Sequence, residues 1–318
     1  MYRNKKISLV IPAYNEEKLI GRTLKNIPKL IDKIYVVDDK SPDNQNVVIR
    51  KCAKKDKRVN LIKHKKNQGP GGAIISGYLQ SNKDGYDIAV VIGGDYQMPI
   101  HEVKNFLDPI INKRVDYTKG NRFLLGKIDD TLKKMPRIKL IGNWLITALT
   151  KIASGYYKTM DVVDGYTAIS REAISRINWS KAWRRYGYPM DFLVRMNAYG
   201  FKILDIPRTA IYLPGEKQSQ IKGLKYFLKV SPMIAKDFFW RLNFKYFYLD
   251  FHPLALFYYL SFILLFTGFV LGMFLIINKV FLGGYHVSGP LAIFDVLLII
   301  SGFQFFLFAM FFDMEEKN

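Results

Sequence analysis

The feature that most limits the fold of this chain is a long uncharged run near its C-terminus. The run Pro253–Asn278 covers 26 residues without a charged side chain, PLALFYYLSFILLFTGFVLGMFLIIN. A helix that crosses a bilayer needs roughly 20 apolar residues. A second run, Pro290–Phe312, holds one charge, Asp295, and the short connector 279–289 joins the two. The pattern predicts a transmembrane helical hairpin, and the alternative is a buried hairpin in a soluble protein.

The charges of the chain are concentrated outside this hairpin. Residues 1–252 hold 46 basic and 23 acidic side chains, whereas the whole chain has a net charge of +21. Basic segments beside a membrane stay on its cytoplasmic side, which predicts a two-span membrane protein with its soluble part and both termini in the cytoplasm. Asp295 can snorkel to the interface, pair with a second copy in a homo-oligomer through the hairpin, or carry a function of its own. The single Cys52 excludes a disulfide within the chain.

A basic surface also suits nucleic acid or phosphate-bearing ligands. Nucleic-acid binding would explain the charge but neither the apolar hairpin nor the acidic residues that follow the strands. We therefore expect no nucleic-acid partner and expect membrane lipids instead.

The first 220 residues alternate short apolar strands with helices, which predicts an α/β fold with a mostly parallel sheet. Asn15 can cap the helix after the first strand, and that helix is expected to run to about Leu30. The expected strands are 7–13, 33–37, 59–63, 88–92, 115–119, 167–170 and 203–206.

Polar residues follow the first, second and fourth of these strands. The fourth strand runs into Gly93-Gly94-Asp95-Tyr96-Gln97. Ligands of open α/β sheets bind at the carboxyl ends of the strands, so we expect the polar clusters to form one site. Asp95 and Gln97 can both offer oxygen to a hard divalent cation. A plain polar turn is the alternative for this short segment taken alone.

The Gly-rich segment 67–73, Asn-Gln-Gly-Pro-Gly-Gly-Ala, has neither the spacing of a dinucleotide fingerprint nor that of a P-loop. It predicts a tight turn into a helix. Its role is open between phosphate binding at that helix N-terminus and turn formation alone.

The segment Ile221–Phe247 is amphipathic and basic, and Pro232 predicts a break into two helices. Such helices beside a membrane span usually lie in the interface, and packing on the soluble core is the alternative. The expected domains are therefore residues 1–220, the interfacial helices 221–250, and the hairpin with its tail, 251–318.

The order of several motifs resembles family 2 glycosyltransferases. These motifs are Ile11-Pro12-Ala13-Tyr14-Asn15-Glu16, Val36-Val37-Asp38-Asp39 with Ser41 and Asp43, Asn67-x-Gly69, and Gly94-Asp95-x-Gln97. Three later elements look closest to polyprenyl-phosphate sugar synthases of the dolichyl-phosphate mannose synthase type: Gly120-Asn121-Arg122, the helix after Met135-Pro136, and Asp164-Gly165-Tyr166. The resemblance covers residues 7–220 and implies a GT-A fold. The hairpin fits relatives with C-terminal spans.

The resemblance also implies roles for individual residues. Asp95 and Gln97 would hold Mg²⁺ or Mn²⁺ on the diphosphate of a GDP- or UDP-linked sugar. Arg122 would meet the diphosphate or the acceptor phosphate, and Asp191 falls near the acceptor. The implied nucleotide-sugar residues are Pro12, Tyr14, Glu16, Val37, Asp38, Asp39, Gly94, Asp95 and Arg122.

Two departures from the family pattern stand out. The usual metal motif is Asp-x-Asp, and its first Asp is Gly93 here. A family element after the last strand, Arg-x-x-Gly-x-Ser-Lys, is replaced by the segment 212–219, in which Tyr212 stands for the Arg and Lys217 can supply the positive charge.

Three functions follow. The first is metal-dependent, inverting transfer of one sugar to a polyprenyl or dolichyl phosphate on the cytoplasmic face, for which an acceptor that is already an oxyanion needs no general base. The second is transfer to a sugar hydroxyl of a lipid-linked glycan, with Asp191 as the base. The third is a catalytically silent membrane protein that binds nucleotide sugars, and Gly93 is the argument for it.

Overall fold

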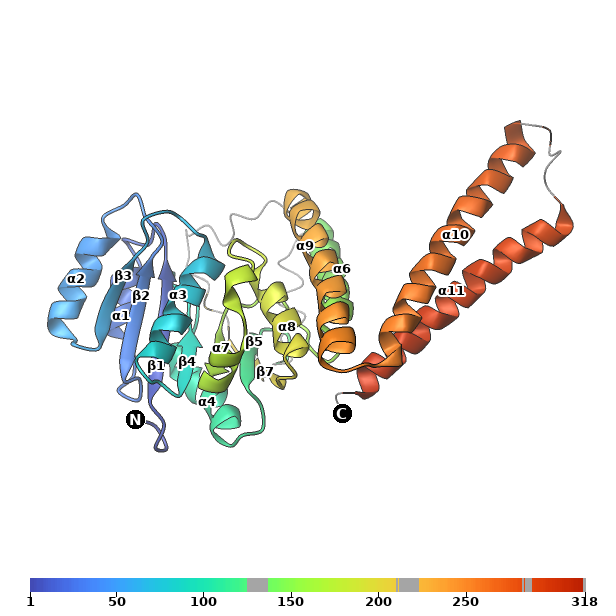
Figure 1. Ribbon diagram of the computed structural model, residues 1–318. Coiled ribbons are helices and arrows are strands. Elements are labelled where there is room, and N and C mark those ends of the chain that lie inside the picture. The colour runs from blue at the N-terminus through green and yellow to red at the C-terminus, as the bar shows by residue number, and fades with distance from the viewer. Residues whose placement is uncertain (125–136, 210, 212–222, 282, 284–287, 317–318) are drawn as a thin grey trace. The chain divides into compact units, whose positions relative to one another are not determined.

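The computed structural model describes residues 1–124, 137–209, 211, 223–281, 283 and 288–316. The chain divides into two compact units, Met1–Phe238 and Phe239–Asn318, which are described separately. The first unit holds the sheet and the second holds two long apolar helices (Figure 1).

The first unit is built on a seven-stranded mixed sheet with the strand order β3-β2-β1-β4-β6-β5-β7. Strands β1 to β4 pair in parallel, β6 runs antiparallel to both β4 and β5, and β7 is parallel to β5. The predicted α/β class with a mostly parallel sheet is confirmed. The strands are β1 (Ile7–Ala13), β2 (Lys33–Asp38), β3 (Val59–Lys63), β4 (Ile88–Val91), β5 (Tyr117–Asn121), β6 (Thr167–Ser170) and β7 (Ile203–Pro207).

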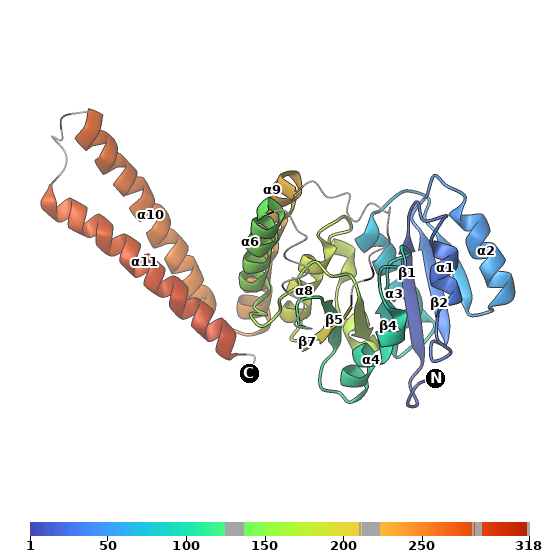
Figure 2. The same cartoon turned by 180° about the vertical axis from the view of Figure 1, so that it is seen from behind.

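Helices cover both faces of this sheet, as Figure 2 shows from behind. Alternate residues of β1 point to opposite faces: Ile7, Leu9 and Ile11 belong to the core cluster beneath α1, α2 and α4. Ser8 hydrogen-bonds Ser81 of α3 on the other face. The helices of this unit are α1 (Ile20–Lys25), α2 (Gln45–Lys55), α3 (Pro70–Lys83), α4 (Val103–Ile111), α6 (Arg137–Ser154), α7 (Arg171–Arg176), α8 (Tyr188–Ala198) and the start of α9 (Gly223–Asn243).

The start of the first helix differs from the prediction. Asn15 is not the N-cap, because its φ is 61° and the helix begins only at Ile20. The backbone N–H of Asn15 donates instead to Ser41 Oγ, at 2.7 Å. The loop after β1 is therefore tied to the loop after β2, and the helix is shorter than expected.

The predicted break at Pro232 is also wrong. Helix α9 runs without interruption from Gly223 to Asn243 with Pro232 inside it. Val230, Met233 and Ile234 are buried on both sides of the proline. Their packing outweighs the loss of one helical hydrogen bond, which costs about 3 kcal/mol in an exposed helix.

The second unit contains the predicted hairpin, formed by α10 (Pro253–Phe281) and α11 (Gly289–Glu315). Both helices are long and apolar enough to cross a membrane by length and composition. Glycines allow the two helices to approach closely: a Cβ on Gly268 would lie 2.8 Å from Ile299, and one on Gly272 would lie 2.9 Å from Asp295. Asp295 is thus buried against the partner helix of its own hairpin.

A buried polar cluster joins the end of α9 to the end of α11 within the second unit. The Arg241 guanidinium donates to both carboxylate oxygens of Asp313, at 3.0 and 2.7 Å, and both side chains are fully buried. The Tyr246 hydroxyl, in the π-helical turn η3 (Phe244–Leu249), donates to Asp313 Oδ1 at 2.8 Å. Two segments 70 residues apart are therefore fastened together.

Candidate active site

Strand ends converge at one edge of the sheet. The parallel strands β1, β2 and β4 bring their carboxyl ends to this edge, and β5 and β7 end there as well. Because β6 is antiparallel to β4 and β5, its start reaches the same edge, and Gly120 N donates to Tyr166 O at 2.7 Å. The edge therefore collects residues from strand ends and from the loop that precedes β6.

Asp95 lies in the loop after β4 and is mostly buried. Its Oδ1 accepts a hydrogen bond from Gln97 N at 3.2 Å. Burial raises the pKa of the Asp95 carboxyl, and Arg208 partly opposes that rise. A Cβ on Gly93 would lie only 2.7 Å from Asp95 Oδ1. The carboxylate of Asp95 therefore occupies space that a side chain at position 93 would need.

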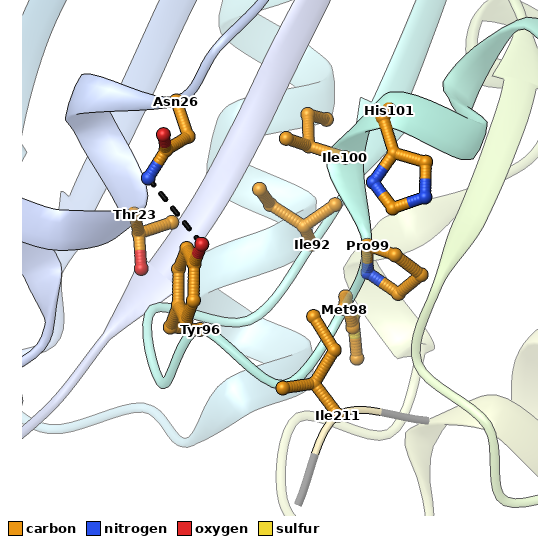
Figure 3. Close-up of a pocket in the computed structure, with 9 residues that line it drawn as sticks. All are labelled: Thr23, Asn26, Ile92, Tyr96, Met98, Pro99, Ile100, His101 and Ile211. Carbon is orange, nitrogen blue, oxygen red and sulfur yellow. Dashed lines mark hydrogen bonds between the residues drawn. The ribbon is translucent and has the colours of Figure 1, made fainter. Parts of the chain in front are cut away.

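The conformation of this loop is fixed by contacts with α1. Tyr96 has a φ of 58°, which is rare for a residue with a side chain. The Arg22 guanidinium lies 4.3 Å from the centre of the Tyr96 ring, and Thr23 Oγ1 donates to Gly94 O at 2.9 Å. These contacts border a hollow of about 210 Å³ beside the loop (Figure 3). Its lining residues are Thr23, Asn26, Ile92, Tyr96, Met98, Pro99, Ile100, His101 and Ile211.

The two acids at the end of β2 are occupied by contacts within the protein. The Asp38 carboxylate accepts from Ser41 N, Gln45 Nε2 and Asn46 Nδ2 at 3.0, 2.6 and 2.8 Å. The Asp39 carboxylate accepts from Gln68 N and Gly69 N and contacts His64 Nδ1, all within 2.7 Å. Both acids hold neighbouring loops in place.

The Gly-rich turn is likewise used by the protein itself. Two of its amides, Gln68 N and Gly69 N, bind Asp39, and Gly72 N donates to Arg184 O at 3.0 Å. A Cβ on Gly71 would lie 2.6 Å from Trp183 O. Of the two roles left open by the sequence, these contacts favour turn formation and close backbone approach over phosphate binding.

Arg122 follows β5 and forms an ion pair that the sequence did not suggest. Its Nε and one terminal nitrogen donate to the two oxygens of Asp161, at 2.7 and 2.9 Å. The register of β5 and β7 brings a second arginine to the same place. Asn121 of β5 lies opposite Pro207 of β7, so Arg208, the next residue after Pro207, lies next to Arg122. Arg208 donates to Asp164 Oδ2 at 2.7 and 2.6 Å. Two arginines and two aspartates thus cluster at the ends of β5 and β7, and the charge of Arg208 acts on Asp95.

Asp191 is placed in a closed environment. It is buried in the first turn of α8, where Arg195 Nε lies 2.9 Å and 3.1 Å from its two oxygens. Trp183 N donates to Asp191 Oδ2 at 3.0 Å. The carboxyl of Asp237, on α9, lies against this cluster, and burial followed by the charge of Asp191 raises the pKa of Asp237 to about 8.

The other residues implied for nucleotide binding differ in accessibility. Tyr14 is 50% exposed, and Pro12 and Glu16 are partly buried close to Gly94. The side chain of Val37 is fully buried in β2. Lys217 lies outside the described residues.

Comparison with known proteins decides the family. The sequence pattern described as Glycosyl transferase family 2 matches residues 8–177. The chain belongs to this family. It is 32% identical over 252 residues to the UDP-N-acetylglucosamine–dolichyl-phosphate N-acetylglucosaminyltransferase of Methanococcus voltae, covering 75% of this chain and 95% of that protein. It is 27% identical to the polyprenol monophosphomannose synthase of Mycolicibacterium smegmatis, over 63% of this chain and 76% of that protein.

Solved structures agree on the fold of this glycosyltransferase. Glucosyl-3-phosphoglycerate synthase from Mycobacterium tuberculosis, in complex with Mn²⁺, UDP and phosphoglyceric acid, matches with a TM-score of 0.52 at 16% identity. The match covers 75% of this chain and 78% of the neighbour. The expected GT-A fold is confirmed, and the chain is a family 2 glycosyltransferase related to dolichyl- and polyprenyl-phosphate sugar transferases.

The donor set of the transferase fits a divalent cation held jointly with a diphosphate. No group of three or more His, Cys, Asp or Glu side chains placed to hold a metal occurs among the described residues. Asp95 and Gln97 offer one carboxylate and one amide oxygen from a single loop. Mg²⁺ is commonly bound by one or two carboxylates together with substrate phosphates and water, so two protein ligands suffice.

Sequence reasoning missed several residues of this edge. Arg208 directly follows β7, so the rule that ligands lie at strand ends could have found it. Asp161 lies before the antiparallel strand β6, and a rule about the carboxyl ends of strands does not predict residues that precede a strand. His64 is buried between Asp39 and Ser76 Oγ, 2.8 Å from the latter, and an isolated histidine in a sequence does not reveal such partners.

Proposed function

We propose that this glycosyltransferase transfers a single sugar from a GDP- or UDP-linked donor to a polyprenyl phosphate of the dolichyl type. The reaction is metal-dependent, inverts the anomeric centre and takes place at the cytoplasmic face of the membrane. The observation that carries the proposal is the presence, in one chain, of the Asp95 edge and two helices long enough to span a bilayer. The two relatives named above act on dolichyl phosphate and polyprenol monophosphate by their names, which supports this acceptor.

The donor side of the proposal rests on the edge residues. We assign Pro12, at the end of β1, and Tyr14 and Glu16, which follow it, to the nucleotide, and Asp38 and Asp39 hold the neighbouring loops in place. We assign Asp95 and Gln97 to a Mg²⁺ or Mn²⁺ ion bound together with the donor diphosphate. Such an ion, when bound, neutralises the charge that develops on the leaving diphosphate.

The chain's own cations supply the second part of that neutralisation. Arg122 and Arg208 lie at the ends of β5 and β7, each oriented by an aspartate, so their positive charge is held in place before the donor binds. Preorganised charge of this kind is usually the largest contribution to catalysis. We assign Lys217 to the same role.

The acceptor side rests on an apolar surface of the first unit. In the first unit, α6 exposes Trp144, which is 70% exposed, together with Leu145 and Leu149. Exposed tryptophan and leucine on a helix suit the membrane interface. The excess of basic residues in 1–252 supports a cytoplasmic location of the sheet unit, by the positive-inside rule.

A phosphate acceptor also agrees with the arrangement of Asp191. A general base must reach the proton that it removes. Asp191 is instead buried and bound by Arg195 and Trp183 N. A lipid phosphate is ionised near neutral pH and attacks without such a base, so the hydroxyl-acceptor reaction is the less favoured alternative.

The deciding experiment incubates membranes carrying the enzyme with undecaprenyl or dolichyl phosphate and, separately, with labelled UDP-N-acetylglucosamine, UDP-glucose and GDP-mannose. We expect one donor to give a labelled lipid that mild acid releases as the free sugar. Asp95→Ala should abolish the product, while Asp250→Ala, an exposed acid outside the sheet unit, should not.

Two results would overturn the proposal. Label transferred only to a lipid-linked glycan and never to the lipid phosphate would establish the hydroxyl acceptor. Near-normal transfer by Asp95→Ala in the presence of added Mg²⁺ or Mn²⁺ would remove the metal assignment.

A further inference from the structure

The segment between η2 (Trp179–Lys181) and α8 lies directly against the Gly-rich turn. Gly72 N donates to Arg184 O, and a Cβ on Gly69 would lie 2.6 Å from that same oxygen. Arg185 donates to Asn67 Oδ1 at 2.6 Å. The two loops are therefore interlocked through backbone contacts that tolerate no side chain at the glycines.

The same segment is fastened from the side of α8. Asp191 Oδ2 accepts from Trp183 N, and the indole N–H of Trp183 donates to Tyr186 O at 2.9 Å. Gly187, with a φ of 107°, then turns the chain into α8. The carbonyl of Tyr186 is thus held by Trp183, whose own backbone N–H is held by the buried Asp191.

The side chain of Tyr186 is exposed in spite of this rigid support. It is 56% exposed, and the segment that carries it contacts the Gly-rich turn, whose amides bind Asp39 after β2. Partial burial, then the carboxylates of Glu16 and Asp95 and the phenol of Tyr14, raise the pKa of the Tyr186 hydroxyl. An exposed tyrosine with few accessible conformations offers a flat apolar surface and a hydrogen-bond donor at small entropic cost.

We propose that Tyr186 binds the donor, contacting the sugar and diphosphate of the nucleotide sugar opposite Tyr14. Asp191 is then a positioning residue, which acts by holding Trp183 and through it Tyr186. This inference rests on the proposed nucleotide-sugar donor and adds a residue to its site.

The first test measures donor binding and steady-state kinetics for Tyr186→Phe and Tyr186→Ala. The probes are UDP-N-acetylglucosamine, UDP-glucose and GDP-mannose, each with Mn²⁺. We expect Tyr186→Ala to weaken binding of the preferred donor about tenfold or more and to raise its KM equally. Tyr186→Phe, which loses only the hydroxyl, should weaken it about threefold to tenfold. The KM for the lipid phosphate should stay within twofold.

Tyr86→Phe is the matched control. Tyr86 is a partly buried tyrosine that precedes β4, at the opposite edge of the sheet, and donor binding should not change there. Donor binding by Tyr186→Ala within twofold of wild type would overturn the inference. If wild type binds a donor but makes no lipid-phosphate sugar, the proposed acceptor is wrong, while the proposed donor and the role of Tyr186 are unaffected.

The positioning role of Asp191 depends on the link from Trp183 to Tyr186. Trp183→Phe tests that link, because it removes the hydrogen bond to Tyr186 O and leaves the contact of Asp191 with the Trp183 backbone intact. We expect it to raise the donor KM about threefold, as the loss of one hydrogen bond implies, with the melting temperature nearly unchanged. In the Tyr186→Ala background the same change should have almost no further effect on donor KM. Fully additive effects of the two changes would overturn the positioning role.

Discussion

The Asp191 carboxylate and the Arg195 guanidinium form a buried ion pair across one turn of α8, with Nε 2.9 Å from Oδ2. We predict that Asp191→Asn lowers the free energy of unfolding by about 3–5 kcal/mol, because it leaves Arg195 buried without its counter-charge. The folded fraction should keep the shape of its pH–rate profile.

Thermal unfolding in detergent and kcat measured from pH 5 to 9 check this prediction together. Loss of the acid limb, with a fall of roughly 10²-fold or more in kcat at unchanged stability, would instead identify Asp191 as a general base.

Gly93 gives a second prediction, because its missing Cβ makes room for Asp95. Gly93→Asp restores the two-carboxylate motif of the family, yet its Cβ would lie 2.7 Å from Asp95 Oδ1. We expect activity to fall, by about 10²-fold or more if Asp95 leaves its metal-binding position.

Gly93→Ala separates the steric effect of Gly93→Asp from the effect of its added charge, since it adds the Cβ without a carboxylate. Both variants should be impaired in initial rates at saturating Mn²⁺. An initial rate of Gly93→Asp equal to or above that of wild type would show that the loop adapts and that crowding at Asp95 does not affect activity.

Asp237 makes the stability of the sheet unit depend on pH. Its folded-state pKa is raised to about 8 by burial and by the charge of Asp191, while Arg195 and Lys236 oppose that rise. The folded protein therefore holds a proton between about pH 4 and 8 that the unfolded chain has lost, and stability falls as pH rises through this window. Asp237→Asn mimics the protonated form, so its melting temperature should gain on wild type as pH rises from 5 to 8.5.

Asp250→Asn serves as the control for this series, because Asp250 is exposed. The difference in melting temperature between Asp250→Asn and wild type should be constant with pH. A constant difference for Asp237→Asn as well would show that Asp237 is ionised throughout the range.

The Arg241–Asp313 pair predicts how firmly the end of the hairpin is fastened to α9. Asp313→Asn should destabilise the second unit by about 3–5 kcal/mol, because both partners are fully buried. Glu172→Gln breaks the exposed Arg176–Glu172 pair and should cost no more than about 0.5 kcal/mol. Proteolysis of the α9–α10 junction in detergent reports the difference, and equal cleavage rates for the two variants would contradict the prediction.

The strands and the hairpin were predictable because their signals are local. Short apolar segments mark the strands, and two long apolar runs, the second with one charge at Asp295, mark the hairpin helices. The predicted helix boundaries were wrong where residues distant in the sequence determine the local conformation. Asn15 is drawn away from a capping role by Ser41, and Pro232 stays inside a helix because Val230, Met233 and Ile234 are buried around it.

The site was predictable to a smaller extent, for the same reason. The position of Asp95 followed from the strand before it. The partners of Asp38, Asp39 and Asp191 come from loops up to 30 residues away or from the far side of a turn, and no spacing rule reveals them. Tyr186 carries no motif at all, since its importance comes from a backbone held by Trp183 and from the residues that it faces.

The reversed strand β6 also sets the order in which the protein can be completed during synthesis. Neither β4 nor β5 has a neighbour on its inner side until residues 167–170 have been made, because β6 separates them in the sheet. A chain released before that point would leave one edge of β4 and both edges of β5 unpaired, because β7 is made later still, and unpaired edges are prone to pair with other molecules. Asp161 and Asp164, which orient the two arginines, arrive on the same short stretch of chain. Strand β6 therefore joins the two parts of the sheet, and the active site is complete only after β7 and Arg208 have been made.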